Sequence, residues 1–128
     1  MFSGFVALPP GTVISAPTHL VFRHYGIVSE CGTVLSCSAR VGHAAEETVE
    51  AFSGGKPWRV EKRPNDLPWW EVIARARSLA QRPYHLTQWN CESYVAACYG
   101  LPPRSHQVGR TLLIAFAGML AFTALNAE

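Results

Sequence analysis

Charge is scarce in this chain: only 16% of its 128 residues are charged, against 48% that are apolar. That balance excludes an intrinsically disordered chain, because such chains have too few apolar residues to form a core. No run of basic residues is longer than Lys62-Arg63, so the dense basic patch of a nucleic-acid-binding protein is missing. We expect one globular domain and no nucleic-acid partner.

Sorting and metal-binding patterns are also missing. Residues 1–10 have no basic start, and their short apolar run ends in two prolines, unlike a signal peptide. We therefore expect an intracellular protein, cytoplasmic or membrane-associated, with reduced thiols. No Cys-x-x-Cys pair occurs among the four cysteines, which leaves Cys31, Cys37 and His43 as a poorly spaced alternative zinc set. We expect neither a metal nor another cofactor.

The first half of the chain is rich in strand-forming residues. The runs 20–29 and 33–38 flank Glu30-Cys31-Gly32 and predict a β-hairpin. Shorter strands are predicted at 12–15 and 58–62. The segment 41–53 fits a helix, but its part from Thr48 to Phe52, followed by Gly54-Gly55, also fits a strand and a turn.

Two helices are predicted in the second half. Asp66 and Pro68 are suited to start an amphipathic helix that runs from Trp69 and ends before Pro83. Asn90 is a favoured N-cap for a second helix, which ends at Gly100.

Cys91 is the first candidate for chemistry, because it directly follows the predicted N-cap. Free backbone N–H groups and the helix dipole both favour a thiolate there. The alternative is a small buried core residue. The backbone N–H of Cys91 is also suited to stabilise an oxyanion, an interaction typically worth about 3 kcal/mol of barrier.

His24 is the candidate base for that thiol, since it lies on a predicted strand rather than on a loop. His19, His43, His85 and His106 compete for this role, and His24 as a core residue is the alternative. Strand alternation places Gly26 and Val28 on the same face as His24. The partner strand then offers that face either Ser36 or Cys37, depending on the register.

The C-terminal stretch 111–125 contains no charged residue. As a helix it would span about 22 Å, less than the ~30 Å hydrocarbon core of a bilayer. A tilted membrane anchor, an interfacial segment and a helix docked on the domain are the three alternatives. We expect membrane contact, because the stretch has no polar side to present to water.

Several motifs together resemble one family. The segment 23–28, Arg-His-Tyr-Gly-Ile-Val, resembles the His-aromatic strand motif of the lecithin:retinol acyltransferase-like proteins, which include the H-Ras-like-suppressor phospholipase/acyltransferases in the wider NlpC/P60 group. The block Asn90-Cys91-Glu92 resembles their Asn-Cys-Glu nucleophile motif. Pro10-Gly11-Thr12 and the segment 99–108 resemble the opening of those proteins and the segment before their apolar tail.

The resemblance implies an α+β fold of the circularly permuted papain-like type, with an antiparallel sheet that carries the base and a following helix that carries the nucleophile. It implies a catalytic domain over residues 1–106 and an apolar segment over 107–128. Lipid-acting members place a second His where this chain has Ser36, so Ser36 or His43 is left to orient His24. Arg23, Tyr25 and Asn90 are expected to position the substrate or the oxyanion.

The expected activity is acyl transfer from a lipid ester, or hydrolysis of that ester. Either reaction proceeds through a thioester intermediate on Cys91 with His24 as base, and the acyl donor is a phospholipid or another acyl lipid. The apolar stretch 111–125 would hold the site at a membrane surface. A peptidase or amidase of the NlpC/P60 type that uses the same pair is one alternative. A catalytically inactive membrane-binding module is the other.

Overall fold

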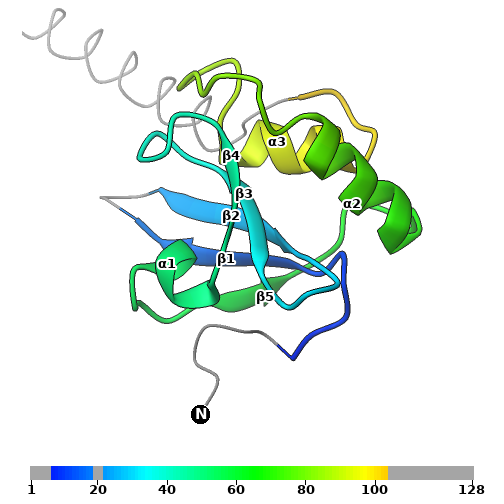
Figure 1. The fold of residues 1–128 in the computed structure, drawn as a ribbon, viewed down its shortest axis with the longest axis horizontal. Helices are drawn as coiled ribbons and strands as arrows, with labels where there is room; N and C mark the ends of the chain where they lie inside the picture. Colours follow the sequence, from blue (N-terminus) through cyan, green and yellow to red (C-terminus); the bar gives the residue numbers. More distant parts are fainter. Residues whose placement is uncertain (1–6, 19–21, 104–128) are drawn as a thin grey trace, which may run out of the picture.

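The computed structural model describes residues 7–18 and 22–103. Five antiparallel strands form one sheet in the order β4-β3-β2-β1-β5. The strands are β1 (Val13–Pro17), β2 (Arg23–Val28), β3 (Val34–Cys37), β4 (Ala44–Glu47) and β5 (Arg59–Glu61). Helices α1 (Val49–Ser53), α2 (Trp69–Ser78) and α3 (Cys91–Cys98) complete an α+β fold (Figure 1).

The two faces of the sheet carry separate cores. Helices α2 and α3 cover one face, and the short α1 covers the other (Figure 1). On the α2–α3 face, residues such as Ile27, Leu35 and Tyr94 form the larger cluster. On the α1 face, Val34 and Phe52 belong to a smaller cluster. Alternation along β2 and β3 explains this division, because successive side chains point to opposite faces.

The predicted hairpin is confirmed, and its register is set by the pairs Ile27↔Leu35 and Val28↔Val34. Neither alternative for the segment 41–53 is right as a whole, because β4 covers 44–47 and α1 follows it directly over 49–53, where the strand alternative was predicted. Thr48 caps α1 by accepting a hydrogen bond from the backbone N–H of Ala51. Because the chain changes from strand to helix within ten residues, neither the two-residue period of a strand nor the 3.6-residue period of a helix is repeated often enough to be recognised among the apolar residues.

Helix α3 begins and ends where its sequence predicts. Asn90 is its N-cap, and Gly100 follows its end with a φ of 73°, a conformation that glycine adopts without strain. Helix α2 differs in detail, because Pro68 rather than Asp66 is its N-cap and no side chain caps it. It also ends at Ser78, earlier than the predicted end before Pro83. The hydroxyl of Tyr94 on α3 donates to the backbone oxygen of Ala76, which ties α3 to α2.

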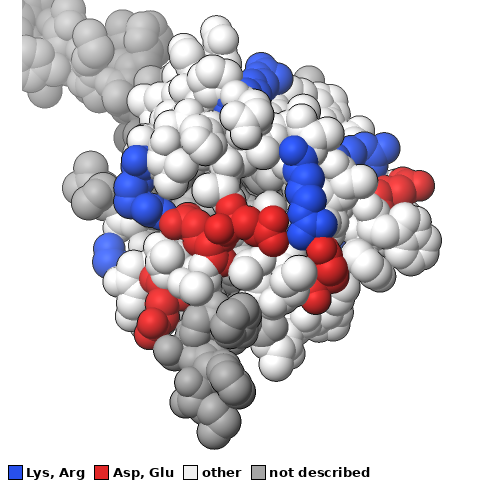
Figure 2. All heavy atoms as spheres, viewed as in Figure 1, with Lys and Arg blue, Asp and Glu red and all other residues white. Residues whose placement is uncertain are grey.

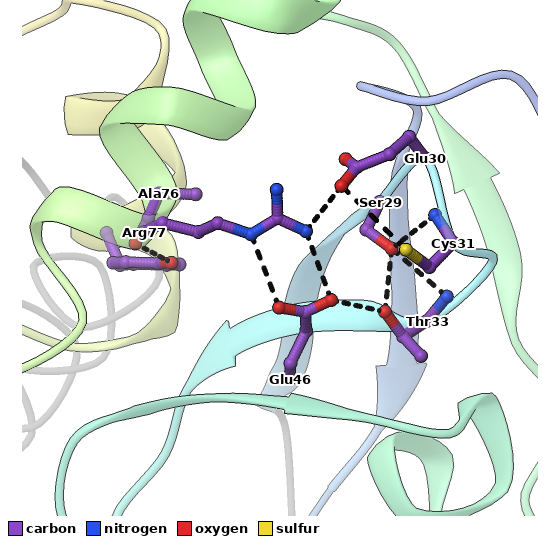
Figure 3. Close-up of polar contacts among 8 residues, drawn as sticks. Ser29, Glu30, Cys31, Thr33, Glu46, Ala76 and Arg77 are labelled. Atoms are coloured by element: carbon purple, nitrogen blue, oxygen red, sulfur yellow. Dashed lines mark hydrogen bonds and ion pairs between the residues drawn. The ribbon is translucent and has the colours of Figure 1, made fainter.

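A network of charged and polar groups joins α2 to the hairpin (Figure 3). Arg77 contacts the carboxylates of Glu30 and Glu46, and Glu46 also accepts from the Thr33 hydroxyl. In space-filling view, acidic side chains form a belt across this face with basic side chains at both ends (Figure 2). Because Glu30, Glu46 and Arg77 come from three separate parts of the chain, the network adds polar contacts between α2 and the sheet to the apolar packing of α2.

The expected apolar stretch 111–125, and with it the segment 107–128, lies outside the described residues. Within the described ranges, no helix has the length and apolar character that crossing a membrane requires.

Candidate active site

Helix α3 holds Cys91 at a rigid position. The Asn90 side chain accepts hydrogen bonds from the backbone N–H groups of Glu92 and Ser93, at 3.1 and 3.0 Å. In return, the Ser93 hydroxyl accepts from the backbone N–H of Asn90 at 2.6 Å. This reciprocal capping box fixes the first turn of the helix. Cys91, its first residue, therefore has little freedom to move.

The Cys91 sulfur lies against strand β2. Its thiol donates to the backbone oxygen of Arg23 at 3.8 Å, and the backbone N–H of Tyr25 donates to the sulfur. These are the two residues on either side of His24. Both residues pair with β1, but the β2–β3 pairs are only Ile27↔Leu35 and Val28↔Val34. The sulfur therefore bonds β2 beyond the residues that pair with β3.

His24 reaches the same cavity from the α1 face. Its ring stacks on Phe52, with centroids 4.6 Å apart and an angle of 24° between the planes. Gly26, two residues further along β2, makes room for Phe52, because a Cβ there would lie 2.7 Å from its ring. Cys91 and His24 both line a cavity of about 440 Å³. No hydrogen bond joins their side chains in the part of the chain that the structure describes.

The walls of this cavity combine apolar and basic side chains. Phe22, Phe52 and Leu86 contribute apolar surface, and Lys56 and Arg40 are basic residues of the wall, of which Arg40 is paired with Glu47. An apolar cavity with a few cationic groups matches the chemistry of an acyl chain attached to an anionic group. Sequence reasoning missed Phe52, Arg40 and Lys56, because they come from the ambiguous segment 41–53 and from loops beside it.

Burial controls the pKa of both candidate groups. It raises the pKa of the Cys91 thiol to about 11, although nearby backbone N–H groups oppose this. The expectation of a thiolate at the helix start is therefore wrong for this structure, because desolvation outweighs the helix N-terminus. Burial also lowers the pKa of His24 to about 4, so both groups are neutral at pH 7.

Two of the other predicted site residues, Arg23 and Asn90, also line the cavity that holds Cys91 and His24. The Arg23 guanidinium donates to the Ser15 hydroxyl at 2.9 Å, and Tyr25 lines a second cavity of about 500 Å³. Ser36 shares the face of His24, as one of the two possible registers requires, but its hydroxyl has no hydrogen-bond partner among the described residues. His43 bonds the backbone oxygen of its neighbour Ala44 at 2.8 Å.

The remaining cysteines are not bonded to each other. All four cysteines are free thiols. Cys37 lies in the wall of the Cys91 cavity and donates to the backbone oxygen of Trp89 at 3.9 Å. Within residues 7–18 and 22–103, no group of three or more His, Cys, Asp or Glu residues is arranged to hold a metal ion.

The fold and the site define an α+β protein with a capped helix that presents a cysteine to a histidine-bearing strand. A model of the lecithin retinol acyltransferase family matches residues 18–102, and the chain belongs to that family. Proteins of this family are in general Cys–His acyltransferases and hydrolases with acyl-lipid substrates. No curated protein matches the chain.

Proposed function

We propose that the protein transfers or hydrolyses the acyl group of a phospholipid through a thioester on Cys91, with His24 as general base. The observation that carries this proposal is that Cys91 and His24 line one cavity whose walls are apolar and basic. The family match, which covers both residues, supports the same chemistry. The proposal includes the circularly permuted papain-like arrangement that the family resemblance implies.

The reaction begins with both groups neutral. As the Cys91 sulfur attacks the ester carbonyl, His24 takes the thiol proton and passes it to the leaving alkoxide. The carbonyl carbon gains the C–S bond and loses the C–O bond, which leaves a thioester. Water or an amine then attacks the thioester, and the sulfur recovers a proton. Because the thiol is not ionised beforehand, proton transfer accompanies the attack.

The oxyanion of this reaction needs donors close to the sulfur. The backbone N–H of Cys91 lies at the start of α3, where helix N–H groups are free of helical partners. Catalytic hydrogen bonds are often long without substrate and shorten when it binds. We infer that substrate in the cavity brings the His24 imidazole and the Cys91 thiol into hydrogen-bond distance.

Mass spectrometry of the intact protein tests the proposal. Incubation with vesicles of phosphatidylcholine and phosphatidylethanolamine should add the mass of one acyl group to wild type but not to Cys91→Ser. His24→Gln should slow the addition by at least about 100-fold, the usual scale of general-base catalysis. Labelling by a peptide-based electrophile without any acylation by lipid would indicate a peptidase instead. A wild-type protein that reacts with neither would be a binding module.

We also propose that residues 111–125 hold the site at a membrane surface, which would make the protein membrane-associated. The support is the run of 15 residues without charge. Flotation with liposomes tests this directly. The full chain should float, and a chain ending at residue 110 should float less. Equal flotation of the two would exclude the anchor.

A further inference from the structure

Three polar side chains lie on the α1 face of the sheet, one on each of three adjacent strands. His24 is on β2, Ser36 on β3 and Glu47 on β4. The pairs Val28↔Val34 and Val34↔Glu47 place all three on one face, because residues two apart along a strand point the same way. Ser36 therefore stands on the strand between the imidazole and the carboxylate.

Two oxygen atoms of these three side chains have no hydrogen-bond partner among the described residues. The Oγ of Ser36 and the Oε1 of Glu47 are buried, and neither makes a hydrogen bond within the described residues. Ser36 is only 1% exposed. The other carboxylate oxygen of Glu47 pairs with Arg40. A buried polar atom without a partner costs about 1–3 kcal/mol, so two of them on the face of the sheet that carries a candidate base call for a functional explanation.

The charge of Glu47 acts on the imidazole. Burial is the largest influence on His24 and lowers its pKa, whereas Glu47 opposes this and Arg40 adds to it. Ser36 lies opposite Ala45 on β4, and Glu47 is the next residue of β4 on that face. Diagonal neighbours of this kind lie within reach of long side chains.

We propose that Glu47 is the charged end of an orienting pair for His24. The Ser36 hydroxyl, which has no hydrogen bond among the described residues, turns to accept the imidazole N–H and to donate its hydrogen to Glu47 Oε1. This inference rests on the proposed function, in which His24 is the base. Ser36 and Glu47 are positioning residues, because they act through His24, and no covalent bond changes between them. Glu47 supplies the charge that a serine alone cannot give to the imidazole.

Two readouts test the pair in the full-length protein. The first is the rate of Cys91 acylation by phospholipid vesicles. We expect Glu47→Gln and Ser36→Ala each to lower kcat about 10-fold with little change in KM, because positioning affects the reacting geometry rather than lipid binding. The double variant should be no slower than either single variant, since residues that act as one unit are not additive.

The second readout is the ¹⁵N NMR spectrum of the histidine rings at pH 7, which shows which ring nitrogen carries the proton. We expect one fixed tautomer of His24 in wild type and a mixture in Glu47→Gln and Ser36→Ala. Glu46→Gln is the matched control, because Glu46 is the adjacent residue on the opposite face and bonds Arg77. It should leave both the tautomer and the acylation rate unchanged.

The outcomes separate this inference from the proposed function. Acylation of wild type and Glu47→Gln at equal rates would overturn the pair but leave the proposed function standing. Absence of acylation in wild type would overturn the proposed function, and the tautomer ratio would still test the pair. An equal tautomer ratio in wild type and both variants would overturn the pair. If Glu47→Gln fails to fold, Ser36→Ala carries both readouts, since it removes only one hydroxyl.

Discussion

The imidazole of His24 lies flat against the ring of Phe52, with 4.6 Å between the centroids. This contact joins a residue near the start of β2 to the short helix α1. It holds the candidate base in partly apolar surroundings, where the neutral imidazole is favoured over the charged form.

Acid should destabilise the protein through His24. Burial lowers its pKa from 6.5 to about 4, so between these values the unfolded chain binds a proton that the folded chain does not. The stability contributed by neutral His24 is present above pH 6.5 and is lost as the pH falls toward 4. We expect a loss of about 2 kcal/mol between pH 7 and pH 4.5 that His24→Gln lacks. Urea unfolding at both pH values measures it, and equal losses in the two proteins would contradict it.

The Cys91 thiol should react slowly in the absence of substrate. Its pKa is raised to about 11, so only a small fraction is thiolate at pH 7, and the thiolate is the reactive form. Cys31 is exposed and is the matched comparison. We expect iodoacetamide to alkylate Cys91 at least about 10-fold more slowly than Cys31 at pH 7. Peptide mapping by mass spectrometry measures both rates, and faster alkylation of Cys91 would show an activated thiol.

Removal of the α3 cap should affect both stability and acylation. In Asn90→Ala the backbone N–H groups of Glu92 and Ser93 lose their acceptor, which costs about 1 kcal/mol of stability. The first turn then holds Cys91 less firmly, so acylation should slow as well. Asn90→Asp keeps an acceptor oxygen and serves as the control. Denaturant unfolding and the acylation rate check the two effects, and an unchanged Asn90→Ala protein would exclude the role of the cap.

The network around Arg77 should contribute to stability in a salt-dependent way. Arg77→Met removes contacts to Glu30 and Glu46 on two other elements. Each partly exposed pair contributes at most about 1 kcal/mol, so we expect a loss of about 1 kcal/mol that shrinks in 1 M salt. Glu71→Gln, whose ion pair with Arg75 is 3.8 Å long, should change stability by less than about 0.5 kcal/mol. A loss for Arg77→Met that is independent of salt would show that packing, not charge, is responsible.

The helix starts and the hairpin could be predicted from the sequence because their signals are local. Asn90 before Cys91 and Gly100 after Tyr99 determine where α3 begins and ends. Glu30-Cys31-Gly32 between two β-rich runs determines the hairpin. The segment 41–53 could not be assigned, because a four-residue strand shows only two periods of its alternation and a five-residue helix little more than one turn.

The sequence by itself determined the candidate pair Cys91 and His24, because motif and helix capping are properties of neighbouring residues. Only the tertiary structure decided what surrounds that pair. The register of β3 and β4 aligned Ser36 and Glu47 on the face of His24, and the packing of α1 placed Phe52 against its ring. Burial in the folded chain then made the thiol and the imidazole neutral. Desolvation depends on how distant segments pack around a group, which the local sequence does not specify.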